Sequence, residues 1–209
     1  MIYTKENLSS LDKIYRLNLI NSITGYKPAN LIGTRSKNYQ SNLAIFSSVV
    51  HLGSNPALIG IITRPNTVPR HTYKNIIDTN YYTINHISKD NIKKAHYTST
   101  KFKSNESEFE KCDLKEMYID DFYAPYVEES EVKIGLKLIE ETVIKSNNTI
   151  LIVGEIVTII IENNLVDKDG SLKFENMDSV CISGLDTYYE TKKLAKYPYA
   201  KRYELPNKW

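Results

Sequence analysis

The sequence of 209 residues contains few residues of the kinds that cross-link a chain or ligate a metal. It has two cysteines, Cys112 and Cys181, which are far apart and form no CxxC pair. A zinc or iron–sulfur site built from cysteine is therefore not expected. Two isolated thiols are typical of a reducing compartment, and the N-terminus MIYTKENLSSLDK lacks the apolar core of a secretion signal. We predict a cytoplasmic protein.

The fingerprints of several large enzyme classes are also missing. The motifs GxGxxG, GxxxxGK[ST], HExxH and GxSxG do not occur. Their absence argues against a Rossmann dinucleotide site, a P-loop, a zinc protease and an α/β-hydrolase nucleophile. The four histidines (His51, His71, His86 and His96) follow no metal-ligand spacing, so each is expected to be structural or a hydrogen-bond donor, and we predict no metal site.

Strong charge and long apolar runs are lacking as well. A net charge of +2 provides no field that would hold the chain to nucleic acid or to an acidic membrane. The longest apolar run, Ile150 to Ile161, is interrupted by Gly154, Glu155 and Thr158 and is too short to cross a bilayer. We therefore expect no nucleic-acid or membrane partner. The length fits one domain with a full core and helical additions, residues 1–209.

Apolar periodicity and turn residues predict four helices. The first covers Ser10–Ser22, with Ser9 or Ser10 as its cap and Gly25 as its end. A second begins with Thr67 as cap and Pro69 in its first turn and runs to Asp78. The remaining two are a polar helix from Ser88 to Lys101 and a short one within Ser104–Cys112.

The rest of the chain is typical of strands. Alternation over Val132–Ile139, the turn pair Asn147-Asn148 and the run Thr149–Ile161 predict a hairpin of long strands. Antiparallel hairpins with helices as additions indicate a mainly β protein with a barrel. Further strands or strand-like apolar runs are predicted at Ala29–Thr34, Leu43–Leu52, Pro56–Thr63, Tyr81–Ile87 and Val180–Ser183, and a turn at Asp167–Gly170.

Two segments could carry chemistry. Small and hydroxyl residues in Ser41–Ser48 would let a flat ligand approach the backbone, although an ordinary strand with serines in a bend has the same composition. Thr63-Arg64-Pro65 and Arg70-His71-Thr72 place basic and hydroxyl side chains at an expected helix start, where free N–H groups favour a phosphate. A solvated basic loop is the alternative for this second segment.

The order of several short segments resembles the flavin reductase-like family of FMN-binding split-barrel proteins. The likeness covers nearly the whole chain. Its residues are Arg16–Thr34 (RLNLINSITGYKPANLIGT), Ser41–Ile62 (SNLAIFSSVVHLGSNPALIGII), Thr63–Ile76 (TRPNTVPRHTYKNI), Tyr81–Ile87, Ala95–Ser99, Phe122–Ser130, Gly154–Ile156 and Ser183–Tyr189.

The resemblance implies an antiparallel split β-barrel that forms a homodimer and binds FMN non-covalently. It also implies an NAD(P)H-dependent flavin reductase that passes electrons to free flavin or to a redox partner protein, with no catalytic side chain because the chemistry belongs to the flavin. Ser47, Thr63, Arg64, Arg70 and Thr72 would hold the phosphate, with His71 beside them. The other implied cofactor residues are Ser41, Asn42, Ala44 and Ser48 along the ring edge, Lys27 and Asn30 nearby, and Asn85, His96 and Thr98 closing the site.

The chain departs from the family pattern at several places. Tyr39 stands in a turn where relatives commonly have glycine, and Ile61, Thr63 and the ending from Tyr197 to Trp209 also differ. These departures concern the electron-donor side more than the FMN site. They keep open a flavoredoxin-like electron carrier that is reduced by a protein donor. A third hypothesis is a binding protein that keeps the barrel without the cofactor, and the retained cluster of serine, arginine and threonine argues against it.

Overall fold

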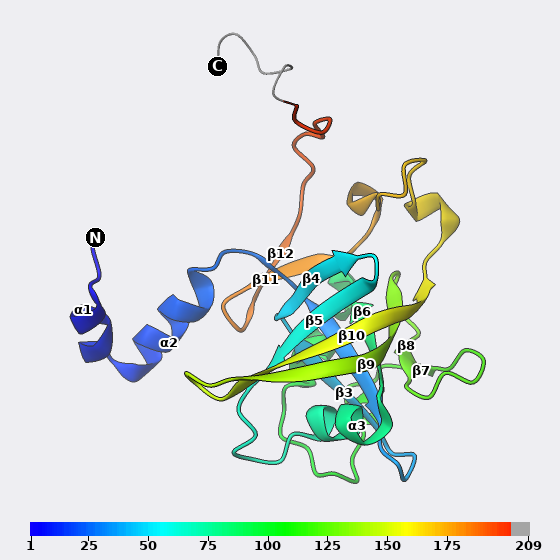
Figure 1. Ribbon diagram of the computed structural model, residues 1–209, viewed down its shortest axis with the longest axis horizontal. Coiled ribbons are helices and arrows are strands. Elements are labelled where there is room, and N and C mark those ends of the chain that lie inside the picture. The colour runs from blue at the N-terminus through cyan, green and yellow to red at the C-terminus, as the bar shows by residue number, and fades with distance from the viewer. Residues whose placement is uncertain (202–209) are drawn as a thin grey trace.

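The computed structural model describes residues 1–201 and has one large antiparallel sheet at its centre (Figure 1). Its seven strands are ordered β3-β2-β6-β9-β10-β5-β4. The edge strands β3 and β4 are consecutive in the chain and are separated only by Ser47 and Ser48, so the sheet curls until its edges meet. The strands are β2 (Asn30–Arg35), β3 (Ser41–Phe46), β4 (Val49–Ser54), β5 (Ala57–Thr63), β6 (Tyr81–His86), β9 (Lys133–Ile144) and β10 (Thr149–Ile160).

The hairpin of β9 and β10 forms the longest part of this barrel. Its register starts at the pair Thr149 and Ile144, and Asn148 turns the chain with a left-handed φ of 58°. Asparagine tolerates this conformation, which explains why the Asn-Asn pair makes the turn. The predicted hairpin and the mainly β barrel are confirmed.

Two apolar clusters lie on opposite faces of the strands. The barrel interior holds Ile32, Ile61, Tyr82 and Ile152, together with Ile76 from α3 (His71–Thr79). The outer face of β2 and β3 is covered by the second cluster, which includes Leu31, Leu43, Phe109 and Ile182. Alternation of side chains along β2 sends Leu31 and Ile32 into different clusters, because this strand is buried on both faces.

Smaller elements cover the outer cluster. β1 (Lys27–Pro28), β11 (Val180–Ser183) and β12 (Thr187–Glu190) form a three-stranded sheet, and β7 (Glu116–Met117) pairs with β8 (Tyr126–Val127). Val180–Ser183 is therefore a strand, as predicted, and β12 follows it. The short helices are η1 (Lys89–Asn91), α4 (Ile92–Tyr97), α5 (Glu108–Lys111), η2 (Asn163–Leu165) and η3 (Phe174–Asn176).

The helical N-terminus differs from the prediction. Two helices form, α1 (Lys5–Ser10) and α2 (Lys13–Ser22), and they extend away from the barrel (Figure 1). The prediction of Ser9 or Ser10 as cap was wrong, because Asp12 accepts the N–H groups of Ile14 and Tyr15 and begins α2. A carboxylate that accepts two backbone N–H groups is a stronger N-cap than the serines, which lie at the end of α1.

Helix α3 begins later than the sequence predicted. Its N-cap is Arg70, whereas Thr67 and Pro69 lie in the preceding loop. Val68 stands before Pro69, and a residue before proline is disfavoured in helical conformation, so a helix that begins at Thr67 is disfavoured as well.

The other two helices are shorter than predicted, and one predicted apolar run is divided. The stretch Ser88–Lys101 splits into η1 and α4, which ends where the Thr98 and Ser99 hydroxyls donate to the carbonyls of Ala95 and His96. The run Leu43–Leu52 divides at Ser47-Ser48 into two strands, β3 and β4.

Candidate functional site

The start of α3 presents unpaired backbone donors. The first backbone bond of the helix runs from the Lys74 N–H to the Arg70 carbonyl, and no described side chain caps the helix. The amide groups of His71, Thr72 and Tyr73 therefore lack an intrahelical acceptor. Such a helix end attracts an anion through its N–H groups and its positive potential.

A buried polar network fixes this helix start against the barrel. The Asn42 Nδ2 donates to the hydroxyls of Thr72 at 3.0 Å and Thr34 at 3.3 Å, and Asn75 donates to Thr34 at 3.1 Å. Four buried side chains from β2, β3 and α3 thus hold one another. Thr34 and Asn75 were not among the predicted site residues, although the alternation of β2 directs Thr34 to the same face as Ile32.

Two buried polar atoms at the ends of the loop that leads into α3 have no partner. Within residues 1–201, neither the Thr63 Oγ1 nor the Arg70 Nε makes a hydrogen bond. Thr63 ends β5 and is only 4% exposed. A buried donor without an acceptor is costly, and such atoms in a native fold call for a ligand or another explanation.

The corner between β3 and β4 lies beside the end of β5. Ser48 donates its hydroxyl to the Ile62 carbonyl at 2.7 Å, one residue before Thr63. Arg64 is exposed on the following loop. Next to α3 lies a cavity of about 280 Å³, lined among others by Asn66, Arg70 and His71. The structure thus places Thr63, Arg64, Arg70 and Thr72 between the end of β5 and the start of α3, with Ser48 bonded to the end of β5 and Ser47 next to it in the chain.

Other predicted residues lie elsewhere and are held within the protein. The Lys27 ammonium donates to the carbonyls of Asn21 and Gly184, and Ser41 contacts Ser107 and Glu116. Asn85 is buried and bonds to Leu31, Thr83 and Val127.

Two further predicted residues lie at α4. His96 contacts the Tyr188 hydroxyl at 3.1 Å, whereas Thr98 donates to its own helix. These side chains are held by bonds elsewhere in the fold and do not join the start of α3.

Asn30 lies at the other end of β2. It pairs with Phe46 on β3 and His86 on β6, and its buried Nδ2 has no partner within residues 1–201. Burial lowers the pKa of His86 to about 4, and its imidazole contacts Ser179 and stacks on Phe174. The sequence did not identify His86 as a site residue, because the only sequence feature that bears on its placement is the alternation of residues along β6. Both residues line a second cavity of about 530 Å³.

The turn before β3 contains a residue in an unusual conformation. Tyr39 has a φ of 64°, which glycine adopts without cost. The Arg35 guanidinium lies 4.6 Å from the Tyr39 ring and 4.9 Å from the Tyr118 ring, and these contacts favour the strained turn.

Residues 1–201 contain no cluster of three or more histidine, cysteine or acidic side chains that could hold a metal ion. Over the same residues, no helix combines the length and apolar character needed to cross a membrane. The predicted departure of Tyr197–Trp209 lies outside the described residues from Arg202 onward.

Comparison with known proteins gives consistent matches. The profile described as "Flavin reductase like domain" matches residues 26–176. A Shewanella frigidimarina structure named as a flavin reductase with a split barrel domain has 46% identity and a TM-score of 0.92, covering 96% of this chain and 100% of its own. The flavoredoxin of Desulfovibrio vulgaris shares the fold at 24% identity and a TM-score of 0.72, over 84% and 92% of the chains. An uncharacterized protein of Aquifex aeolicus is 26% identical over 166 residues, 78% of this chain and 83% of that protein.

Proposed function

Since this chain belongs to the flavin reductase-like family, we propose that it is an FMN-binding oxidoreductase reduced by NAD(P)H. The single observation that carries the proposal is the pair of unpartnered buried donors at Thr63 and Arg70, beside the uncapped start of α3. A phosphate monoester would supply acceptor oxygens to each of these groups at once.

In this proposal each part of the cluster has a distinct task. Arg70 and Thr63 donate to the phosphate, the amides of His71 and Thr72 add further donors, and Arg64 supplies charge from the rim. Asn42 does not reach the phosphate in this scheme: it positions α3 through its bond to Thr72. The network therefore sets the direction of the helix start before any ligand arrives, which lowers the cost of binding.

In this proposal the ring edge of the cofactor lies along the corner of β3 and β4. Ala44, Ser47 and Ser48 are partly exposed there, and the main chain leaves regular pairing between β3 and β4. Backbone N–H groups at this corner can donate to the carbonyl oxygens of a flavin ring, where negative charge grows on reduction. When bound, FMN supplies the redox chemistry, accepting electrons from NAD(P)H and passing them to an acceptor.

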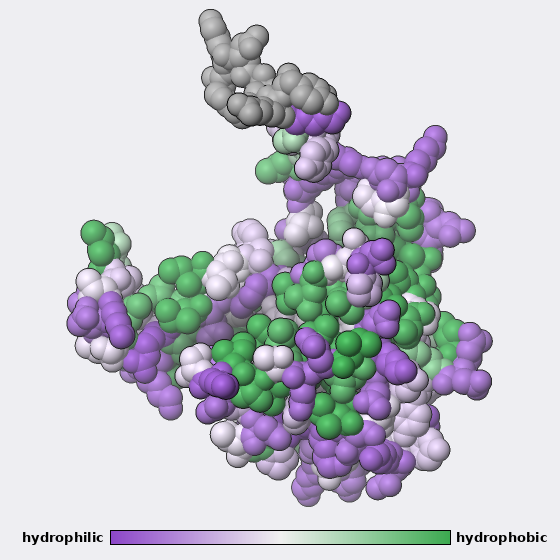
Figure 2. Space-filling model, viewed as in Figure 1, coloured by the Kyte–Doolittle hydropathy of each residue, from purple (hydrophilic) through white to green (hydrophobic). Residues whose placement is uncertain are grey.

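We further propose that the working form is a homodimer. Figure 2 shows apolar side chains gathered over β4 and β5, and Val50, Leu52 and Ile62 there are 42%, 45% and 38% exposed. The Leu52 and Val50 side chains pack around Gly60 on this outer face. A contiguous exposed apolar patch of this kind marks an interaction surface.

A fluorescence titration of the protein with FMN tests the phosphate assignment. Replacing Arg70→Ala removes a charge-assisted donor, so we expect FMN affinity to fall by at least about tenfold. Riboflavin, which lacks the phosphate, should bind wild type and variant with the same affinity.

The matched control is Lys111→Ala. Lys111 is exposed on α5, pairs with Glu106 and lines neither cavity, so this variant loses the same charge away from the site. If both variants weaken FMN binding equally, the loss of net positive charge would explain the effect. Arg70 would then have no specific contact with the phosphate.

A further inference from the structure

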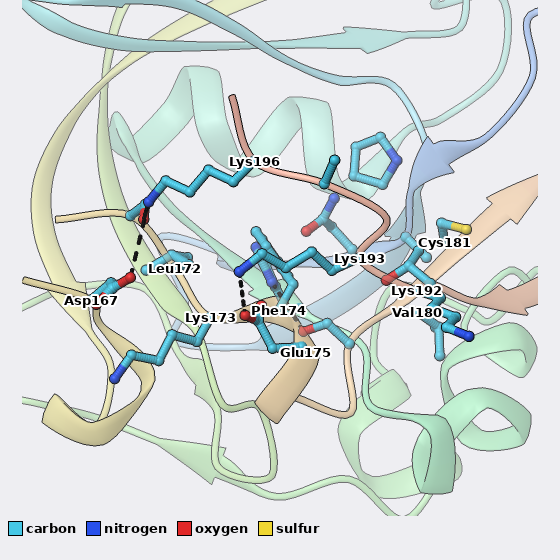
Figure 3. Close-up of a pocket in the computed structure, with 18 residues that line it drawn as sticks. Asp167, Leu172, Lys173, Phe174, Glu175, Val180, Cys181, Lys192, Lys193 and Lys196 are labelled. Carbon is cyan, nitrogen blue, oxygen red and sulfur yellow. Dashed lines mark hydrogen bonds and ion pairs between the residues drawn. The ribbon is translucent and has the colours of Figure 1, made fainter. Parts of the chain in front are cut away.

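The cavity of about 530 Å³ at the other end of the barrel is separate from the phosphate cluster. It lies between β2, the segment that contains η3, and the C-terminal segment that follows β12 (Figure 3). None of Thr63, Arg64, Arg70 or Thr72 lines it. Its size falls in the range of small-molecule sites, about 300–1,000 Å³.

The floor of this cavity combines one unpartnered donor with flat apolar surface. Asn30 is 1% exposed, and its Nδ2 has no acceptor within residues 1–201. The rings of His86 and Phe174 are parallel, with an interplanar angle of 10° and centroids 6.1 Å apart. An aromatic ring of a ligand can pack on this surface while an oxygen accepts from Asn30.

The rim carries an excess of positive charge. Four lysines and two carboxylates line the cavity. Figure 3 shows that two of the lysines face these carboxylates, Lys193 with Glu175 and Lys196 with Asp167. Lys196 also pairs with Asp169, which does not line the cavity. Lys173 donates to the Asn164 carbonyl, and Lys192 has no partner within residues 1–201. Lys173 also lies close enough to Glu175 to help lower the pKa of that carboxyl, so among the four it is Lys192 that remains without a carboxylate within residues 1–201.

We propose that this cavity binds an aromatic carboxylate, with its ring on Phe174 and His86 and its carboxylate between Asn30 and Lys192. An uncharged aromatic compound would form no ion pair with Lys192. An aliphatic acid would not pack on the rings of Phe174 and His86. Because Asn30 is paired with Phe46, one residue before Ser47, a molecule in this cavity lies beside the corner that we assign to the flavin ring. The inference concerns binding alone and stands whether or not FMN is bound.

The test is isothermal titration of the full chain with 2-naphthoate and with its uncharged counterpart 2-naphthamide. We expect saturable binding of one naphthoate per chain, at least about tenfold tighter than the amide, which is the value of one charge-assisted contact. Lys192→Gln should remove most of this preference, and Asn30→Leu should weaken naphthoate binding by about tenfold. Phe174→Ala should weaken both probes. Lys37→Gln, an exposed lysine on the far turn, should change neither.

Three outcomes would overturn the assignment. The first is equal affinity for naphthoate and naphthamide, and the second is unchanged naphthoate binding in Lys192→Gln and Asn30→Leu. The third is competitive displacement of naphthoate by NADH or FMN, which would show that the cavity is a nucleotide-binding site. Arg70→Ala separates this question from the proposed function, because it should lose FMN affinity and keep naphthoate affinity.

Discussion

At the scale of single residues, Thr63 illustrates how a ligand site differs from a well-packed core. Its buried hydroxyl makes no bond within residues 1–201. Replacing Thr63→Val removes that hydroxyl and keeps the shape of the side chain. We expect the cofactor-free protein to become more stable, by on the order of 1 kcal/mol, because the burial penalty of an unpaired polar group is relieved. FMN affinity should fall in the same variant.

Urea unfolding without FMN and FMN titration measure the two effects. The structurally satisfied Thr98, whose hydroxyl donates to Ala95, provides the control, and Thr98→Val should be destabilising. A destabilised Thr63→Val with normal FMN affinity would show that the hydroxyl has a structural partner and no part in the site.

His86 gives a prediction on pH. Burial lowers its pKa to about 4, whereas the same group titrates near 6.5 when unfolded. Below about pH 6.5 His86 is protonated in the unfolded chain but stays neutral in the folded chain. The free energy of unfolding therefore decreases as the pH falls from about 6.5 towards 4. The loss from this group at pH 5 is at most about 2 kcal/mol.

Urea unfolding at pH 7 and pH 5 measures this loss. The difference between the two pH values should shrink in His86→Gln and persist in His51→Gln, which changes an exposed histidine on β4. If His86→Gln leaves the difference intact, another group is responsible for the pH dependence.

At the scale of elements, β2 is held close to the segment before β8. A Cβ on Gly33 would collide with the Pro125 carbonyl oxygen and with the Thr83 hydroxyl, which are themselves joined by a 2.6 Å hydrogen bond. We expect Gly33→Ala to cost about 1–3 kcal/mol, because the backbone at Pro125 must move.

Thermal or urea unfolding measures this cost. Gly53→Ala is the comparison, since the nearest atom to its new Cβ lies at 3.3 Å near the edge of the sheet. Equal losses in the two variants would mean that the contact at Pro125 relaxes without cost.

The sequence predicted elements well where local chemistry decides them. Alternation and the Asn147-Asn148 pair gave the β9–β10 hairpin, and the runs at β2, β5, β6 and β11 were recovered. Helix starts were predicted less well. The restriction that Pro69 places on Val68 moved the start of α3 to Arg70, and Asp12 capped α2 in place of the serines.

The candidate site was predicted in part for a similar reason. Hydroxyl and basic residues near a helix start can be read from the sequence, and the structure brings Asn42 to Thr72 and Ser48 to Ile62. Thr34 and Asn75 were missed because their roles depend on which face of β2 meets α3. The burial of Arg70 Nε also depends on tertiary contacts that no local pattern contains. The assignment of residues 1–209 to one domain stays a prediction.

At the scale of the whole molecule, the apolar face of β4 and β5 predicts the assembly. Placing a charge there by Leu52→Glu should convert a dimer into monomers, because an unpaired carboxylate would be buried in the interface. Sedimentation velocity measures the change. Tyr97→Glu alters a residue on α4 that is 56% exposed, more than the 45% of Leu52, and should remain dimeric. A dimeric Leu52→Glu protein would move the interface to another face.

The most direct measurement of the central claim is an anaerobic visible spectrum of the FMN-supplemented protein after gel filtration, before and after addition of NADH and then NADPH. The account predicts that the protein stays yellow after gel filtration and that one of the two nucleotides rapidly bleaches the flavin band. A yellow protein that neither nucleotide bleaches would contradict NAD(P)H dependence and indicate an electron carrier that awaits a protein donor. A colourless protein would contradict the FMN site itself.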